Sequence, residues 1–435
     1  DLWDVNVSDF SNDARTSRFA EEGAQEPHIR FVKSLTTKPV VAVGRYTSPD
    51  RMASLVKGKV LDFIGAARPS IADPFLPRKI EEGRVDDIRE CIGCNVCVSG
   101  DNTVSPIRCT QNPSMGEEWR KGWHPERIAP ARKAAKVLVV GGGPAGLEAA
   151  RALGQRGFEV SLAEASKELG GRVSREARLP GLSEWARVRD WRVGQINKMP
   201  SVATYLDSRL EAADVLEFGA EHVVIATGSR WRRDGFGRSH GLGIPGFEDN
   251  KNVFTPDDLM DGRLPEGEVV VFDDDGGYHA TVVAELLAKS GRRVHFVTPE
   301  DVVAPWGQFT LEYRHVRKRL AALGVQVQVS KLVTGYTGRE LRLADAWSGD
   351  ASAISADAVV AVTSRLPEDA LYQAMRAVET RWRDAGLASV QRIGDCEAPG
   401  LIAHAVYAGH ALAQGLGEPM GEGVPFRRHF HHDIG

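Results

Sequence analysis

Residues 136–146 read Lys136-Val-Leu-Val-Val-Gly-Gly-Gly-Pro-Ala-Gly146, and this stretch decides the fold of the region around it. Its first five residues form a mostly apolar run with the length of a buried strand, and a glycine-rich loop follows at once. A helical pattern extends from there to Gly157, and a second strand, Glu159–Ala163, ends at Glu164. This order of strand, GxGxxG loop, helix, strand and acidic residue is the fingerprint of a Rossmann-type dinucleotide-binding unit.

The glycines and the acidic residue of this unit have separate roles. Gly141 permits a tight turn, Gly143 lets the main chain approach a pyrophosphate, and Gly146 lets the helix pack closely on the strand. The helix N-terminus attracts the phosphate charge. Glu164 lies 23 residues after Gly141, where its carboxylate can accept hydrogen bonds from a ribose.

Three later motifs match the pattern of flavoprotein reductases that have two dinucleotide domains. The motifs are Leu169-Gly-Gly-Arg172, Val223-Val-Ile-Ala-Thr-Gly-Ser229 and Arg392-Ile-Gly-Asp-Cys396. The residues expected to contact the nucleotide are Gly171, Arg172, Thr227, Gly228 and Asp395. We therefore expect residues 131–235 and 385–435 to form a domain that binds ADP or FAD.

A second unit of the same kind, predicted over residues 236–384, lacks the phosphate loop. Between a strand at 268–272 and a helix at 280–289 stands Asp273-Asp-Asp-Gly-Gly-Tyr278 in place of GxGxxG. A like-charge pair at ~4 Å costs on the order of 1 kcal/mol in water and several times more when partly buried, so three carboxylates would repel a pyrophosphate. We expect a Rossmann-like domain without a nucleotide, although the aspartates could instead bind a cation.

Four of the five cysteines fall in one short segment, Cys91-Ile-Gly-Cys94-Asn-Val-Cys97 with Cys109. Thiolates are the soft ligands that iron–sulfur clusters and zinc prefer. The CxxCxxC spacing favours a [4Fe–4S] cluster, because zinc sites more often pair two CxxC units or add histidines. Disulfides are the remaining alternative, which a cysteine-poor chain does not favour. Residues 89–130 are therefore predicted to hold the cluster and a linker.

Residues 1–88 show strands alternating with helical stretches, which predicts βα units around a parallel sheet. The expected strands are 2–7, 38–45 and 60–68, and the last two end in glycine plus arginine. Such strand ends suit a phosphate site on a (β/α)8 barrel. Three βα units cannot close an eight-stranded barrel, so we expect the other strands to be absent from this sequence or to lie on another polypeptide.

The motifs Ala66-Ala-Arg-Pro-Ser-Ile-Ala-Asp-Pro-Phe75, Asp87-Ile-Arg-Glu-Cys-Ile-Gly-Cys-Asn-Val-Cys97 and Gly122-Trp-His-Pro125 together resemble the trimethylamine/dimethylamine dehydrogenase family. These are old-yellow-enzyme-like flavoproteins with an iron–sulfur cluster. The resemblance implies an α/β protein: the C-terminal portion of a (β/α)8 barrel, strands 6–8, followed by two Rossmann-like domains.

The resemblance also implies roles for residues of the barrel portion. FMN would contact Gly44, Arg45, Ala67 and Arg68, chiefly through its phosphate. Asp13 would be the carboxylate that orients an active-site histidine; taken alone, a helix cap or a turn is the other interpretation of this residue.

Two positions depart from the pattern of trimethylamine dehydrogenase. Phe10 stands near one tryptophan of that enzyme's aromatic cage, and Asp101 stands where the second would be. Such a cage binds an ammonium by cation–π attraction. With a carboxylate in one wall, we expect Asp101 to face a substrate that donates an N–H, such as a secondary amine, a diamine or an N-methylated amino acid.

In function, the resemblance implies oxidative N-demethylation or dehydrogenation of a small amine at FMN. Electrons would pass through the cluster to an electron-transferring flavoprotein. ADP would occupy the first nucleotide domain, with FAD as the alternative, and the enzyme would be a homodimer. The competing hypothesis is an NADPH-dependent enoyl reductase of the 2,4-dienoyl-CoA type.

The composition of the chain bears on nucleic-acid binding, membrane insertion and location. The 435 residues are 42% hydrophobic and 26% charged, with a net charge of −4. Neither this charge nor its distribution predicts nucleic-acid binding. No apolar run approaches the ~20 residues of a membrane span, and no secretory leader precedes the first strand, so we expect a cytoplasmic protein.

Overall fold

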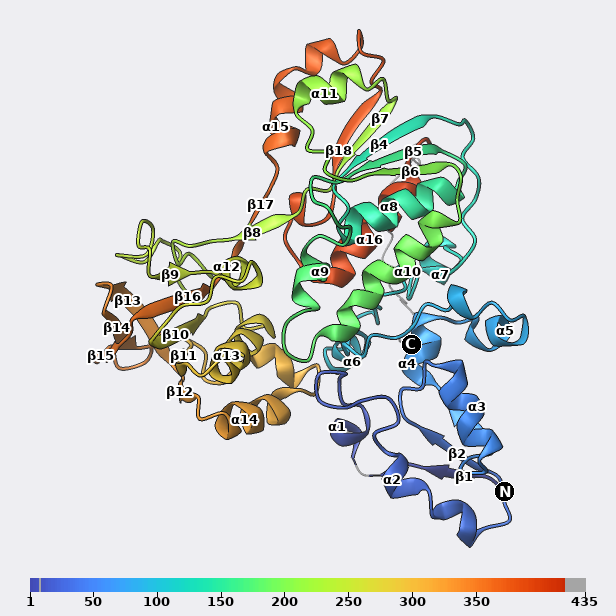
Figure 1. Ribbon diagram of the computed structural model, residues 1–435, viewed down its shortest axis with the longest axis horizontal. Coiled ribbons are helices and arrows are strands. Elements are labelled where there is room, and N and C mark those ends of the chain that lie inside the picture. Colours follow the sequence, from blue (N-terminus) through green and yellow to red (C-terminus); the bar gives the residue numbers. More distant parts are fainter. Residues whose placement is uncertain (8, 419–435) are drawn as a thin grey trace, which may run out of the picture.

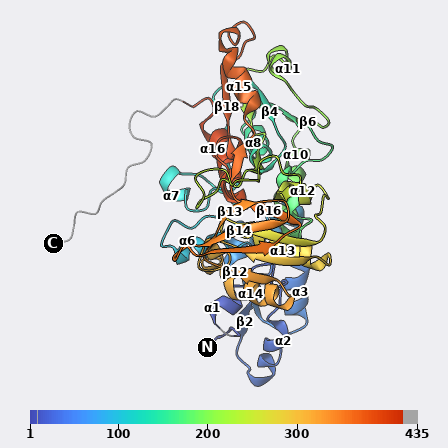
Figure 2. The ribbon, with the colours of Figure 1, turned by 90° about the vertical axis from the view of Figure 1, so that its left-hand side faces the viewer.

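The computed structural model describes residues 1–7 and 9–418. The last part of the predicted segment 385–435, residues 419–435, lies outside the described residues. Figures 1 and 2 show three α/β units, with the N-terminal sheet at the opposite end of the molecule from helices α11 and α15. None of the helices in the described part of the chain has the length and apolarity that a membrane crossing requires.

The N-terminal unit contains a three-stranded parallel sheet in the order β1-β2-β3. Alternate residues of β2 are fully buried, because one face of the sheet packs on the helix that joins β2 to β3. The strands are shorter than the sequence predicts. Their bounds, with those of the helices of this unit, are β1 (Trp3–Val5), α1 (Phe10–Asp13), α2 (Glu26–Ile29), β2 (Val40–Val43), α3 (Pro49–Lys57), β3 (Phe63–Gly65), α4 (Ala67–Ala72) and α5 (Leu76–Glu81).

The second unit is a five-stranded parallel sheet in the order β18-β7-β4-β5-β6. Helices α8 and α16 pack tightly together, since a Cβ on Gly409 would lie 2.2 Å from the Ala145 carbonyl oxygen. The strands are β4 (Lys136–Val140), β5 (Glu159–Ala163), β6 (Val202–Tyr205), β7 (His222–Ile225) and β18 (Ser389–Arg392). The helices are α8 (Pro144–Gln155), α9 (Arg172–Glu176), α10 (Ala186–Asn197), α11 (Ala212–Glu217), α15 (Ala370–Ala377) and α16 (Ile402–Gly415).

The third unit repeats this architecture with a parallel sheet in the order β12-β11-β10-β16-β9 and adds an antiparallel sheet, β13-β14-β15. The chain leaves the second unit on β8 (Ser229–Trp231) and returns on β17 (Arg365–Pro367), and these two strands pair as a ribbon between the sheets (Figure 1). The remaining elements are β9 (Val253–Phe254), α12 (Pro256–Met260), β10 (Glu268–Asp273), α13 (His279–Lys289), β11 (Arg293–Val297), α14 (Tyr313–Ala322), β12 (Gln326–Gln328), β13 (Lys331–Tyr336), β14 (Glu340–Asp345), β15 (Ala351–Ser355) and β16 (Ala358–Val362).

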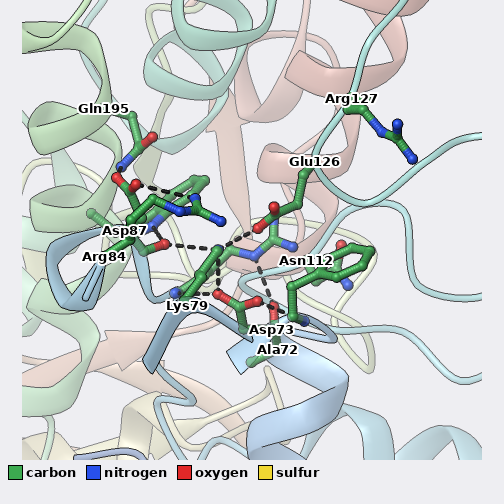
Figure 3. A network of polar contacts seen from close by, with 12 residues as sticks. Ala72, Asp73, Lys79, Arg84, Asp87, Asn112, Glu126, Arg127 and Gln195 are labelled. Carbon is green, nitrogen blue, oxygen red and sulfur yellow. Dashed lines mark hydrogen bonds and ion pairs between the residues drawn. The ribbon is translucent and has the colours of Figure 1, made fainter. Parts of the chain in front are cut away.

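The cysteine segment connects the first two units and carries α6 (Val96–Asn102) and α7 (Glu118–Lys121). A network of polar contacts holds the cysteine segment beside these two units (Figure 3). Buried Lys79 donates to the Asp73 carboxylate at 2.6 Å and to the Asp87 main-chain oxygen at 2.9 Å, and it pairs with Glu126 of the linker. A network of this kind, once desolvated, is costly to break, so it holds the N-terminal unit in place.

Asp87 extends this network to the second unit. Its carboxylate accepts hydrogen bonds from Lys198 at 2.6 Å and Gln195 at 3.1 Å, which lie on and just after α10. Partial burial by itself raises the pKa of Asp87, but the bonds from Lys198 and Gln195 outweigh it and lower that pKa to about 2. The ionised form of Asp87 therefore stabilises the docking of the two units.

Replacing Asp87 by Asn tests this docking. Its pKa is lower in the folded protein than the roughly 3.9 of an unfolded chain, so its stabilising contribution is fully present above about pH 4 and is lost as the pH falls through about 2. We expect Asp87→Asn to lower the free energy of unfolding by about 2 kcal/mol at pH 7. The difference from the wild type should shrink toward pH 2 in urea titrations, while Asp86→Asn, at an exposed neighbour, should have no effect at either pH. A deficit that is independent of pH would contradict an electrostatic role for Asp87.

Candidate flavin, cluster and nucleotide sites

Cys91, Cys94, Cys97 and Cys109 line one small cavity at the junction of the three units. All four thiols are free, and each is buried or partly buried. Hydrogen-bond donors also face the sulfurs: the main-chain N–H groups of Gly93 and Gln111 lie 3.4 Å from the Sγ atoms of Cys91 and Cys109. The Thr110 hydroxyl lies 3.2 Å from the Cys94 sulfur. The folded chain thus brings together the four residues that the sequence assigns to a cluster.

The four thiols share a cavity, but the structure does not place them around a single metal ion. A tetrahedral zinc with Zn–S bonds of ~2.3 Å requires all its sulfurs within about 4 Å of one another. Among the described residues no group of three or more His, Cys, Asp or Glu side chains is close enough to hold one metal ion. Burial raises the pKa of Cys94 to about 12, and it also raises those of Cys97 and Cys109, so a metal would bind here only by displacing their protons.

Asp13, Gly44, Arg45 and Arg68 line a second, neighbouring pocket. A Cβ on Gly44 would lie 2.6 Å from the Tyr46 ring, so only glycine fits there. The main chain then turns into the left-handed region at Arg45 (φ 55°), whose guanidinium donates to the Ala20 carbonyl at 2.9 Å. These features bring main chain and cations to the ends of β2 and β3, where the sequence predicts the FMN phosphate.

The other residues predicted for this region are placed differently. Ala67 is exposed at the first position of α4, next to Arg68 but outside the lining of the pocket. The Asp13 carboxylate is half-buried and accepts a hydrogen bond of 3.3 Å from Gln25. Asp101 is exposed on α6 and does not line the pocket that contains Asp13. Its expected role toward substrate stays a prediction.

A cleft of about 550 Å³ opens beside the glycine-rich loop of the second unit, within the size range of ligand sites. Gly141 has φ 106°, and a Cβ there would lie 2.4 Å from the Ala226 carbonyl oxygen. A Cβ on Gly146 would lie 1.9 Å from the Gly141 oxygen, whereas Gly143 faces open space. The predicted residues that line this cleft are Gly141, Gly143, Glu164, Gly171, Arg172, Thr227, Gly228 and Asp395.

Several polar groups of this cleft are already engaged. Glu164 accepts hydrogen bonds from the N–H groups of Gly142 at 2.7 Å and Ser166 at 2.8 Å. Arg172 reaches out of the cleft and pairs with Asp257 of the third unit at 3.0 Å. Thr227 donates to the Glu368 carbonyl oxygen at 2.5 Å.

Asp395 is the most fully engaged carboxylate of the cleft. It accepts hydrogen bonds from Arg365 at 2.6 Å, the Ser229 hydroxyl at 2.8 Å and the Gly400 N–H at 3.0 Å. Its oxygens are therefore largely satisfied by the protein itself.

The acidic loop of the third unit folds in on itself. Asp273 is fully buried and accepts hydrogen bonds from the N–H groups of Asp275 and Gly276. Burial first, and then the neighbouring Asp275, raises the pKa of Asp273 to about 8. Asp274 is turned inward and accepts a hydrogen bond from the Ser239 N–H at 3.0 Å. The N–H groups of Asp274, Asp275, Gly276 and Gly277 all donate within the protein, so none of these four is free to bind a phosphate.

Tyr278 and His279, which follow this loop, reach across to the second unit. The Tyr278 hydroxyl donates to Glu176 of α9 at 2.7 Å, and His279 Nε2 lies 3.2 Å from the same carboxylate. Burial alone lowers the pKa of His279, but Glu176 outweighs it and raises that pKa to about 9. Sequence reasoning missed this contact between the units, although the bulky Tyr-His pair at the start of a nucleotide-type helix could have indicated it.

Two family models match the chain. Residues 135–409 match pyridine nucleotide-disulphide oxidoreductases. The chain belongs to the pyridine nucleotide-disulphide oxidoreductase family. Residues 1–87 match the NADH:flavin oxidoreductase / NADH oxidase family, which accounts for the partial barrel.

Three individual proteins are similar to nearly the whole of this chain. Dimethylamine dehydrogenase of Hyphomicrobium sp. (strain x) is 40% identical over 444 residues, which cover 95% of this chain and 60% of the relative. Histamine dehydrogenase from Rhizobium sp. 4-9 superimposes with a TM-score of 0.96 and 52% sequence identity. The match covers 99% of this chain and 63% of the histamine dehydrogenase chain. A 6-hydroxypseudooxynicotine amine oxidase from Pseudomonas geniculata N1 superimposes with a TM-score of 0.93 and 53% sequence identity. The match covers 96% of this chain and 62% of the oxidase chain.

These matches confirm the predicted trimethylamine/dimethylamine dehydrogenase family and the predicted fold class, a barrel portion followed by Rossmann-like domains. The chain spans about 60% of the length of these relatives. The activity, substrate and partners of the whole protein are therefore matters for proposal.

Two glycine substitutions should separate folding from nucleotide binding. We expect Gly146→Ala to lower the unfolding temperature, because its Cβ has no room beside the Gly141 oxygen. Gly143→Ala should leave the unfolding temperature unchanged, because its Cβ meets open space, and should reduce the nucleotide recovered by heat release and chromatography at least several-fold. If Gly143→Ala retains the full amount of nucleotide, the pyrophosphate does not bind at this loop.

Proposed function

We propose that this chain carries the cluster and nucleotide sites of an enzyme that dehydrogenates a small or N-methylated amine at FMN. Electrons would leave singly through a [4Fe–4S] cluster to an electron-transferring flavoprotein. The observation that carries the proposal is that the four-cysteine cavity shares Arg68 with the pocket of Asp13, Gly44 and Arg45. The amine substrate class is supported by the names of the relatives, which include two amine dehydrogenases and an amine oxidase.

The proposed reaction assigns a role to each residue of the candidate flavin site. When bound, FMN would supply the acceptor for the electrons of the amine C–H bond, and the cluster would supply a one-electron carrier. Arg45 would hold the phosphate end of the flavin, and Gly44 would allow the main chain to approach it. Asp13, steadied by Gln25, would orient an active-site histidine. The amine product is an iminium, and water converts it to an aldehyde and a smaller amine.

The nucleotide cleft supports ADP over FAD. The Asp395 carboxylate, which holds the far half of the cofactor in the FAD-containing pattern, accepts three hydrogen bonds from Arg365, Ser229 and Gly400. A ribitol that bound to this carboxylate would have to compete with these three bonds. We therefore propose ADP as the occupant.

The competing enoyl reductase would need NADPH at the third unit. There the phosphate loop is replaced by Asp273–Asp275, and Tyr278 and His279 extend from it to Glu176. Carboxylates and bulky side chains both oppose a pyrophosphate at this turn.

We extend the amine dehydrogenase proposal to a homodimer in the cytoplasm. The family resemblance supports the homodimer, and a reducing compartment suits the free thiols.

Anaerobic mixing of the purified enzyme with candidate reductants tests this function. We expect a secondary amine, a diamine or an N-methylated amino acid to bleach the flavin absorbance, and NADPH to leave it unchanged. Chromatography of the nucleotides released on heating should then recover FMN and ADP without FAD. Bleaching by NADPH with no response to any amine, together with recovery of FAD, would contradict the proposal and favour the reductase.

A further inference from the structure

Arg68 belongs to two sites at once. Its side chain lines the cavity of the four cysteines and also the pocket that contains Asp13 and Arg45. From the sequence we expected this guanidinium to contact the FMN phosphate. In the folded chain it is directed toward the loop between Cys94 and Cys97.

The hydrogen bonds of Arg68 fix this direction. Its Nη1 atom donates to the carbonyl oxygens of Ala14 at 3.1 Å and Arg15 at 3.0 Å, and to the Asn95 Oδ1 atom at 2.7 Å. Ala14 directly follows Asp13. One guanidinium therefore joins the segment of the candidate active-site carboxylate to the cysteine loop.

Asn95 completes the connection from the side of the cysteines. It is buried, and it adopts a left-handed conformation (φ 56°) at the start of α6. Its Nδ2 atom donates to the Ala14 oxygen at 2.6 Å and to the Thr310 oxygen at 2.9 Å. Arg68 and Asn95 thus share one acceptor, the Ala14 oxygen, and hold each other in place.

The guanidinium of Arg68 brings a positive charge to the cavity of the cysteines. The three acceptors of its Nη1 atom are uncharged oxygens, so these hydrogen bonds do not neutralise its positive charge. The Arg68 side chain lines the same small cavity as the four cysteines, so its cation lies next to the place that a cluster would occupy. Reduction of a cluster adds negative charge, so a fixed cation beside its ligands favours the reduced form.

We propose that Arg68, held by Asn95, is a positioning residue that raises the reduction potential of the cluster and links it to the flavin pocket. The inference rests on the proposed function, because it requires a cluster in the cysteine cavity. Its effect is to make the cluster a better acceptor for electrons that leave the flavin. Asn95 has no charge of its own and acts by holding the guanidinium.

Potentiometric titration followed by electron paramagnetic resonance of the reduced cluster tests this role without any turnover. We expect Arg68→Gln to lower the ratio of reduced to oxidised cluster at a fixed potential by about tenfold, which is a shift of about 59 mV for a one-electron couple. Arg68→Lys keeps the charge and should stay within about threefold of the wild type. Arg51→Gln removes a half-exposed arginine of the same unit that pairs with Glu26, and should change nothing.

The outcomes distinguish a failure of the proposed function from a failure of the role assigned to Arg68. A wild-type protein without an iron–sulfur signal would overturn the proposed function and this inference with it. A wild-type cluster whose potential is the same in Arg68→Gln would overturn the inference alone. If Arg68→Gln loses FMN while the cluster potential is unchanged, Arg68 is a phosphate anchor and not a residue that tunes the cluster.

Discussion

The side chain of Asn95 holds the loop between Cys94 and Cys97 at the meeting point of the three units. Its amide reaches Ala14 of the barrel portion and Thr310 of the third unit, and its oxygen accepts from Arg68. On the other side of the cavity, Arg192 of α10 donates to Gln111, two residues after Cys109.

Arg192 is itself part of a desolvated ion pair, with fully buried Glu148 of α8 at 2.8 Å. Removing one partner of such a pair leaves an uncompensated buried charge, which is strongly destabilising. The residues next to the cysteines are thus held by contacts with all three units.

The chain contains two nucleotide-type folds whose first turns differ. The glycine-rich loop of the second unit opens on a cleft, while the corresponding turn of the third unit is filled by its own aspartates. Tyr278 and His279 contact Glu176 and thereby join the third unit to the second. These features support the direction of electron flow that we propose, from the flavin to the cluster.

The features that could be predicted from the sequence are those that local spacing determines. The strand and loop at 136–146 and the cysteine spacing impose their geometry within a few residues, and the structure brings their side chains to common sites. Contacts between distant segments leave no such pattern. The direction of Arg68 depends on Asn95 and Ala14, and the pairing of Tyr278 with Glu176 depends on how two domains pack. Asp101 was inferred from the position of an aromatic cage, and it lies exposed on α6.

Metal and sulfide analysis of the purified protein tests the central claim most directly. If Cys91, Cys94, Cys97 and Cys109 hold a [4Fe–4S] cluster, about four iron and four acid-labile sulfide atoms should be recovered per chain. Replacing Cys94 by Ser should deplete both, while replacing the buried Cys396, which lies outside the cavity, should deplete neither. Recovery of a single zinc ion per chain without sulfide would contradict the account, because electrons could not then leave the flavin by this route.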